Sequence, residues 1–299
     1  MGVSQSNVKP ASSTISQVKP SDNTYRPVAT GPTAVNSIRH VCIGINYPKS
    51  GNALTECIND AHNMETFITS RGSQVGIFLS DDEDPSSFLY PCKENIIRAL
   101  KWGTSSASVE EYLSPDVTEF PEMISGTLCF FTYSGHGSHV RDQSGDDSDG
   151  YDEVICPVAR DGTFDDYLVD DTIGDVLFHR SKADCNVLII TDCCNSGTNS
   201  DLRFTVKGRG FTENRRNPIF KGPVIHISGC QDTQYSYEGT GGGYLTLSFI
   251  EAMKTSSKSS LLTVISRIRT NIASRIGKQY QLPELSVGHK TSVYSQFPL

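Results

Sequence analysis

The chain has 299 residues, enough for one large domain or two small ones. Its 34 Asp and Glu outnumber its 26 Lys and Arg, so the formal net charge is −8. This acidic balance argues against nucleic acid as the main partner, because domains that bind nucleic acid are typically basic. No apolar run reaches the roughly 18 residues that a membrane-spanning helix requires, so we expect no transmembrane segment.

The nine cysteines are an odd number and include no C-x-x-C pair. This pattern excludes the usual zinc knuckles and thioredoxin-like redox motifs. We recognise no signal peptide, and we therefore expect a reducing, cytoplasmic location with free thiols.

Residues 1–37 are rich in Ser, Thr, Pro, Asn and Val and show no apolar period, which predicts a flexible N-terminal leader. The opening MGVSQS matches the pattern for N-myristoylation of Gly2. The pattern is short and also matches by chance, so an unmodified N-terminus is an equally good interpretation. One acyl chain would give only a weak, peripheral membrane contact.

From residue 38 onward, apolar segments alternate between the periods that are typical of strands and of helices. Short apolar runs predict strands at 38–46, 74–79, 127–133, 154–158, 187–190, 223–229 and 283–288. Longer periodic patterns predict helices at 53–70, 91–102, 168–180, 244–254 and 261–276. A long connection, 198–222, separates two of the strands. Strands that alternate with helices predict a single α/β domain over 38–299, an αβα sandwich with a mostly parallel central sheet.

Two of these strands run directly into reactive side chains. The stretch NVLIITDCCNSG carries Cys194 shortly after a buried apolar run. The apolar run TLCFFTY leads into SGHGS, which carries His136 between two glycines. In open α/β sheets, catalytic groups collect at the carboxyl ends of the strands. A thiol needs a nearby base to become a nucleophile, and imidazole can act as that base. We therefore expect His136 and Cys194 to be the catalytic pair, with the backbone amides of Gly137 and Cys194 holding the oxyanion.

Five motifs together resemble the metacaspases, of the type I kind, over roughly residue 38 to the C-terminus: YSGHGS, DGYDEVICPV, LVDD, DCCNSG and SGCQDTQYS. The resemblance implies a caspase-like fold with a large region (38–200), a connecting loop (201–221) and a small region (222–299). It also implies a Cys-His endopeptidase that forms a thioester acyl-enzyme, cleaves after Arg or Lys and depends on Ca²⁺. Cys194 aligns with the nucleophile of the family.

The resemblance further assigns two groups of binding residues. The pocket for the basic side chain maps onto Cys57, Asp60, Ser134 and Asp192. A carboxylate at Asp192 would raise the pKa of the nearby thiol if left alone, which also favours a cationic substrate there. The calcium ligands map onto Asp152, Asp170, Asp171 and Asp201. Dense carboxylates suit this ion, but the spacing in DDSDGYDE is not that of an EF-hand.

Several alternatives stay open at this stage. The segment 201–221 is basic and is either a self-cleavage site or a plain linker. Asn195 stands where metacaspases commonly carry His, and the QYSYE run departs from their small-residue pattern. The main alternative to a protease is therefore a weak or inactive caspase-fold scaffold that binds calcium. We expect a monomer that acts on proteins or peptides.

Overall fold

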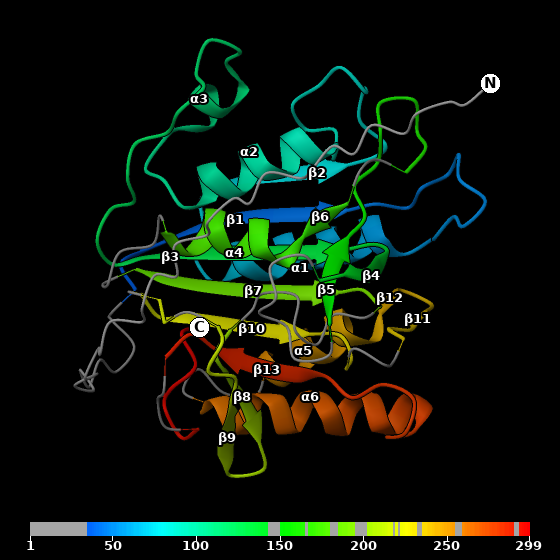
Figure 1. Cartoon of the computed structure of the whole chain (residues 1–299), viewed down its shortest axis with the longest axis vertical. Coiled ribbons are helices and arrows are strands. Elements are labelled where there is room, and N and C mark those ends of the chain that lie inside the picture. Colours follow the sequence, from blue (N-terminus) through cyan, green and yellow to red (C-terminus); the bar gives the residue numbers. More distant parts are fainter. Residues whose placement is uncertain are drawn as a thin grey trace, which may run out of the picture.

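An eight-stranded sheet forms the centre of the molecule in a computed structural model of the chain (Figure 1). The structure describes residues 35–142, 150–164, 167–179, 185–194, 202–217, 219–220, 222–231, 235–254, 259–289 and 293–299. The strand order is β2-β1-β3-β7-β10-β13-β8-β9.

Five neighbouring strands of the sheet are parallel, and the last three are antiparallel. The parallel strands are β2 (Val75–Ser80), β1 (Ser37–Gly44), β3 (Thr127–Ser134), β7 (Asn186–Asp192) and β10 (Val224–Ser228). The antiparallel strands are β13 (Glu284–Val287), β8 (Phe204–Lys207) and β9 (Gly210–Glu213). The carboxyl ends of the parallel strands therefore lie at one edge of the sheet.

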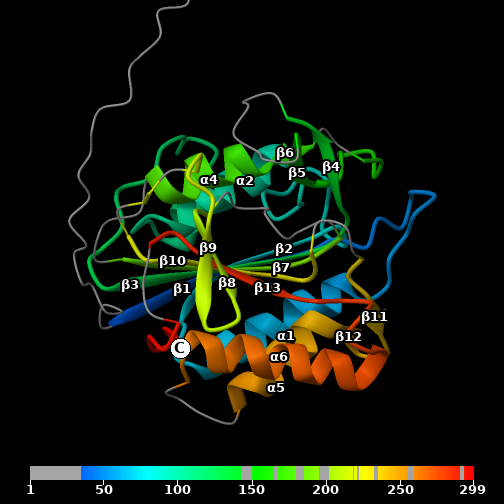
Figure 2. The same ribbon diagram turned by 60° about the horizontal axis from the view of Figure 1, so that its bottom comes forward.

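Helices cover both faces of this sheet (Figure 2). One face carries α1 (Cys57–Ser70), α5 (Tyr244–Lys254) and α6 (Leu261–Ile276), and the other carries α2 (Lys93–Gly103) and α4 (Asp170–His179). The short α3 (Val109–Leu113) follows α2. Two small sheets complete the described fold: β4 (Gly137–Arg141), β5 (Tyr151–Ile155) and β6 (Leu168–Val169), and the pair β11 (Glu238–Gly239) and β12 (Gly242–Gly243).

The continuous apolar runs in the strands follow from burial on both faces. In β1, Val41 and Ile43 pack into the core beneath α2 and α4, while Cys42 packs on the opposite side against α1. Strand side chains alternate between the two faces, so each run contributes to both cores. The predicted αβα sandwich with a mostly parallel sheet is confirmed.

The predicted helices and strands of the domain are present, most with ends shifted by a few residues. The helix expected from residue 53 begins only at Cys57, and the strand expected at 154–158 is β5, which ends at Ile155. The segment expected as an irregular loop, 201–221, contains the hairpin of β8 and β9 in its described part, which extends the main sheet.

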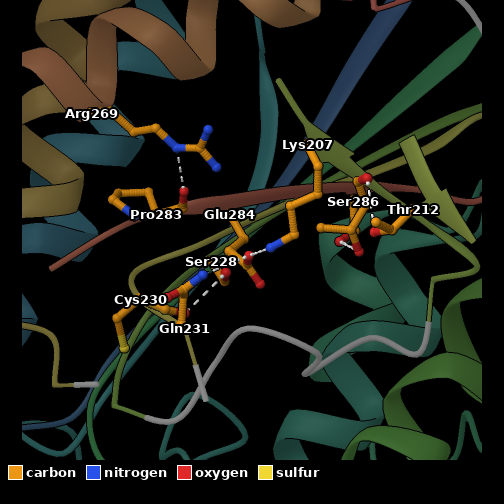
Figure 3. A network of polar contacts seen from close by, with 10 residues as sticks. Lys207, Thr212, Ser228, Cys230, Gln231, Arg269, Pro283, Glu284 and Ser286 are labelled. Atoms are coloured by element: carbon orange, nitrogen blue, oxygen red, sulfur yellow. Dashed lines mark hydrogen bonds and ion pairs between the residues drawn. The ribbon is translucent and has the colours of Figure 1, made fainter. Parts of the chain in front are cut away.

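Polar contacts fix this hairpin to the rest of the sheet (Figure 3). Lys207 at the end of β8 points at the carboxylate of Glu284 on β13 and forms an ion pair with it. The Glu284 side chain is nearly buried, and the side-chain amide of Gln231 donates to its Oε1 at 3.2 Å. Within the hairpin, Arg203 and Glu213 form a second ion pair at 2.9 Å. The hairpin, which makes up most of the described part of the basic segment, is therefore held against the sheet.

Candidate active site

The carboxyl ends of β3 and β7 meet at the edge of the sheet where the sequence predicts the catalytic residues. Their register pairs Ser134 with Asp192, and β1 places Gly44 on the other side of Ser134. A cavity of about 140 Å³ opens at this edge. Its walls contain the predicted residues and several others: Leu54, Cys57, Asp60, Ser134, Gly135, His136, Asp192, Cys193, Cys194, Ser236, Tyr237, Glu238 and Gly243.

The glycine after His136 allows the two strand ends to approach each other. A Cβ atom on Gly137 would lie 2.2 Å from the carbonyl oxygen of Cys194 and 3.0 Å from Sγ of Cys193. No side chain fits at such distances, so only glycine permits this contact. The two residues predicted to supply oxyanion amides, Gly137 and Cys194, are in direct contact.

The imidazole of His136 is oriented by its surroundings. Its Nε2 lies 2.6 Å from the carbonyl oxygen of Asn52. Because a carbonyl can only accept, Nε2 carries the proton and Nδ1 keeps the lone pair in the neutral ring. The ring also packs on Tyr47, with centroids 4.8 Å apart, and meets the edge of Phe164 at 5.6 Å. In the neutral ring, Nδ1 is therefore the nitrogen that can accept a proton.

The loop that supplies the Asn52 carbonyl is itself fixed. The Asp81 carboxylate accepts from the backbone amides of Asn46 at 2.9 Å and Tyr47 at 2.6 Å. Tyr47 adopts a φ of +51°, a conformation that is uncommon outside glycine. Its hydroxyl accepts from the amide of His136 at 3.1 Å and donates to the carbonyl of Cys156. The strained residue thus connects the loop to the backbone of His136.

The two adjacent cysteines have different environments. Cys193 is buried, and burial raises the pKa of its thiol well above the ordinary value. Cys194 is only partly buried, and its Sγ lies 3.9 Å from the carbonyl oxygen of Ser236. Burial also raises the pKa of the Cys194 thiol, and the charge of Asp192 adds to this. Cys194 is thus the accessible thiol of the two, and it needs a base to ionise.

Asp60 and Asp192 form an acidic pair beneath the cavity. Both are buried, with 2% and 7% of their surface exposed. Asp60 accepts hydrogen bonds from the Ser134 hydroxyl at 2.8 Å and from the Gly243 amide at 2.7 Å. Although Asp60 belongs to helix α1, its carboxylate is therefore buried and hydrogen-bonded and does not face solvent.

The Asp192 carboxylate also accepts several hydrogen bonds. Its Oδ2 accepts from the amide and the hydroxyl of Thr246, each at 3.0 Å, and its Oδ1 accepts from the Ser236 hydroxyl. A Cβ atom on Gly243 would lie 2.3 Å from Oδ2 of Asp192 and 2.8 Å from Oδ2 of Asp60. The two carboxylates therefore converge on the backbone of one glycine.

Burial perturbs the titration of this pair. It raises the pKa of Asp60 to about 8, and the charge of Asp192 contributes to the rise. Burial also raises the pKa of Asp192, although the hydrogen bonds from Ser236 and Thr246 oppose the shift. A cation bound between them would favour both ionised forms. Cys57, the other predicted pocket residue, is a buried thiol whose pKa is raised by burial, so it lines the pocket in its neutral form.

Three of the four predicted calcium ligands, Asp152, Asp170 and Asp171, lie on β5 and at the start of α4, which are in contact. Asp152 on β5 and Asp170 at the start of α4 are buried. Asp170 accepts from the backbone amides of Glu153 at 2.9 Å and Asp171 at 3.0 Å. Within the described residues, no three His, Cys, Asp or Glu side chains gather as a metal would require. The oxygen donors suit calcium, but the described part of the set is incomplete because Asp201 lies outside it.

Other predictions also fall outside the described residues: Gly2, residues 1–34 of the leader, and Asn195. Among the helices that are described, none combines the length and the apolar character needed to cross a bilayer. The sequence did not reveal Asn52, Tyr47, Phe164 or Glu238 as parts of the site. Asn52, Tyr47 and Phe164 contact His136, and Glu238 at the start of β11 lines the cavity. Of these four, only Glu238 lies in a stretch that carried a signal, QYSYE, which departs from the metacaspase pattern.

Comparisons with known proteins point to one family. A family model described as the caspase domain matches residues 39–294. The protein called Metacaspase-1 in Candida glabrata is 29% identical over 85% of this chain and 74% of its own length. Its namesakes in Yarrowia lipolytica and Saccharomyces cerevisiae are each 28% identical over 85% of this chain, and over 62% and 67% of their own lengths. The chain thus spans roughly two thirds of the length of these relatives.

One solved structure is similar over most of the chain. The crystal structure of a protein from Geobacter sulfurreducens aligns with a TM-score of 0.59 at 22% identity, covering 87% of this chain and 97% of that one. At this identity the similarity supports the fold alone.

Proposed function

The chain belongs to the caspase-domain family, as a metacaspase of the cysteine peptidase class, and on this premise we propose that it is an endopeptidase that cleaves after Arg or Lys. Cys194 is the nucleophile and His136 its base. The observation that carries the proposal is that one cavity is lined by an accessible thiol, an oriented imidazole and a buried pair of carboxylates.

The reaction proceeds through a thioester. Nδ1 of His136 takes the proton from Cys194, and the thiolate attacks the carbonyl carbon of the scissile bond. The amides of Gly137 and Cys194 donate to the developing oxyanion. His136 then returns the proton to the leaving amine, and the carbonyl stays bound to sulfur. Water, deprotonated by the same imidazole, hydrolyses the thioester and regenerates the thiol.

The acidic pair selects the side chain before the scissile bond. A guanidinium or ammonium group between Asp60 and Asp192 would stabilise both carboxylates in their ionised forms, and a guanidinium could bond to them with several donors. A neutral side chain would leave these buried carboxyls without that compensation. The pair therefore favours Arg and Lys over a neutral residue of similar length, such as Gln.

Substitution of Asp192 tests this specificity. Asp192→Asn keeps the shape of the side chain and removes its charge. We expect kcat/KM for an Arg peptide to fall about 100-fold or more, as for a buried charged contact, with a much smaller change for the matching Gln peptide. Asp192→Ala should lose Arg cleavage as well. Unchanged cleavage after Arg in either variant would contradict the assignment.

Calcium is proposed as the cofactor, held by Asp152, Asp170, Asp171 and Asp201. The support is the chemistry of the donors, because carboxylate oxygens are the ligands that calcium prefers. The ion would supply a structural charge close to the segment that follows Cys194, through Asp201, and so order that segment. The requirement is tested by titrating activity with free calcium after treatment with a chelator.

Self-cleavage is proposed within the basic segment 201–221. Lys207 and Arg203 are engaged in ion pairs, whereas Arg209 is exposed in the turn between β8 and β9. Arg215 and Arg216 are also exposed, and Arg215 contacts Glu213 at 3.5 Å while it remains open to solvent. Mass mapping after calcium addition should find cleavage after one of the three exposed arginines and none in Cys194→Ala. A segment that stays intact in the active protein would show that it is only a linker.

Three further properties are proposed from the sequence: myristoylation of Gly2, a cytoplasmic location with weak membrane contact, and a monomeric state. Intact mass of the protein from its own host tests the first, and an unmodified N-terminus would end it. Fractionation of the same cells tests the second. Light scattering of the purified chain tests the third.

A further inference from the structure

A third carboxylate, that of Glu238, stands at the cavity that contains the acidic pair. Glu238 begins β11 and is exposed, in contrast to the buried Asp60 and Asp192, but it lines the same cavity. Its register partner across the small sheet is Gly243, the residue on which the acidic pair converges. The mechanism proposed above assigns no role to this charge.

The Glu238 carboxylate is held in a defined position. Its Oε1 accepts from the Thr55 hydroxyl at 3.0 Å, and its Oε2 accepts from the Glu56 amide at 3.3 Å. Glu56 is the residue that caps the N-terminus of α1, where a negative charge is favoured by the helix dipole. These two hydrogen bonds keep the carboxylate at the cavity, whereas a Glu side chain without them would move freely in solvent.

The charge acts on the rest of the site. Glu238 contributes to the raised pKa of Asp60, Asp192 and Cys57, which shows that its field reaches the base of the pocket. A single basic side chain between Asp60 and Asp192 engages both buried carboxylates. Glu238 therefore adds negative charge beyond what a single basic residue of a substrate requires.

The neighbouring surface suits a long cationic side chain. Tyr237 lines the cavity and is 39% exposed, and its ring meets that of Tyr280, which is 51% exposed, with centroids 6.5 Å apart. Aromatic faces beside a carboxylate can pack against the aliphatic stem and the charged end of Lys or Arg. Charge and surface thus point to the same class of ligand.

Resting on the function proposed above, we infer that Glu238 binds a second basic side chain of the substrate. The second residue lies within the three residues that precede the cleaved Arg or Lys. The preferred substrates then carry two basic residues close together, and Glu238 is a specificity-determining residue.

The test uses a panel of fluorogenic tetrapeptides that all end in Arg at the cleaved position. One peptide has neutral residues in the other three positions, and in three more a single Lys occupies each of these positions in turn. At low ionic strength and saturating calcium, we expect Lys at one or more positions to raise kcat/KM about 3- to 5-fold, the size typical of an exposed ion pair. Glu238→Gln should remove this gain, so that the peptides with Lys and the neutral peptide are cleaved by the variant with similar kcat/KM.

Two further variants separate charge from structure. Glu251→Gln removes one carboxylate from the exposed side of α5, where Glu251 contacts Arg275, and should keep the full gain. Thr55→Val removes one anchor of Glu238 but not its charge, and should reduce the gain only in part. High salt should weaken the gain in wild type, because an exposed pair is screened.

The outcomes are distinguishable. The inference would be overturned if Lys gave no gain in wild type, or if Glu238→Gln kept the same gain. In either case the proposed cleavage after Arg would be unaffected. An equal loss on all four peptides in Glu238→Gln would show a purely structural role and would also overturn it. If wild type cleaves none of the peptides, the proposed function itself fails.

Discussion

Substitution of Gly137 by alanine should impair catalysis in a protein that remains folded. The new Cβ would lie 2.2 Å from the carbonyl oxygen of Cys194, whereas ordinary contacts begin at 3.4 Å. The obstructing atom belongs to the backbone and cannot rotate away, so His136 and Cys194 must move apart by about 1 Å. A displacement of that size at a reacting centre costs about 100-fold in rate.

The assay is hydrolysis of an Arg peptide by Gly137→Ala, with the melting temperature measured on the same sample. We expect kcat/KM to fall about 100-fold while the variant remains folded. Gly210→Ala is the matched control, because a Cβ there meets nothing within 4 Å, and it should retain activity. Activity of Gly137→Ala within a few-fold of wild type would refute the proposed close approach of the two strand ends.

Three other predictions follow from named contacts. The raised pKa of Asp60 means that the folded state keeps a proton that the unfolded state loses near pH 4, so the melting temperature should fall as pH rises from about 4 to about 8. Asp60→Asn should flatten this dependence, and an equally steep slope in the variant would contradict it. Tyr47→Phe deprives the amide of His136 and the carbonyl of Cys156 of a partner and should lower the free energy of unfolding by about 1–3 kcal/mol in urea titrations, together with kcat. Asp170→Asn should raise the free calcium needed for half-maximal activity at least 10-fold, while Asp175→Asn, exposed on the same helix, should not.

The sequence was most informative where burial dictates residue type. The runs in β1, β3 and β7 had to be apolar because both faces are covered, so their periodicity predicted the sheet. His136 and Cys194 were predictable for the same reason, since they follow two of these strands at one edge of the sheet. The hairpin of β8 and β9 was missed because its strands have only four residues each and lie in a segment whose basic residues suggested a loop.

The chain did carry a signal for that hairpin. Gly208 has a φ of +60° in the two-residue turn between Lys207 and Gly210, as tight hairpin turns require. By contrast, no local pattern could assign Asn52 or Glu238 to the site. Asn52 lies in the loop after β1 and Glu238 begins β11, and the role of each depends on contacts between segments that are far apart in sequence.

The central claim is that Cys194 is the nucleophile and that Asp60 and Asp192 bind the basic side chain of the substrate, and one experiment tests both. It compares hydrolysis of matched peptides with Arg or Gln at the cleaved position by wild type and Cys194→Ala, with millimolar calcium and with chelator. We expect calcium-dependent cleavage of the Arg peptide by wild type alone, and no detectable cleavage by the variant. Equal activity of the two proteins would contradict the proposed mechanism, and a wild type inactive at every calcium level would indicate a caspase-fold scaffold instead of a protease.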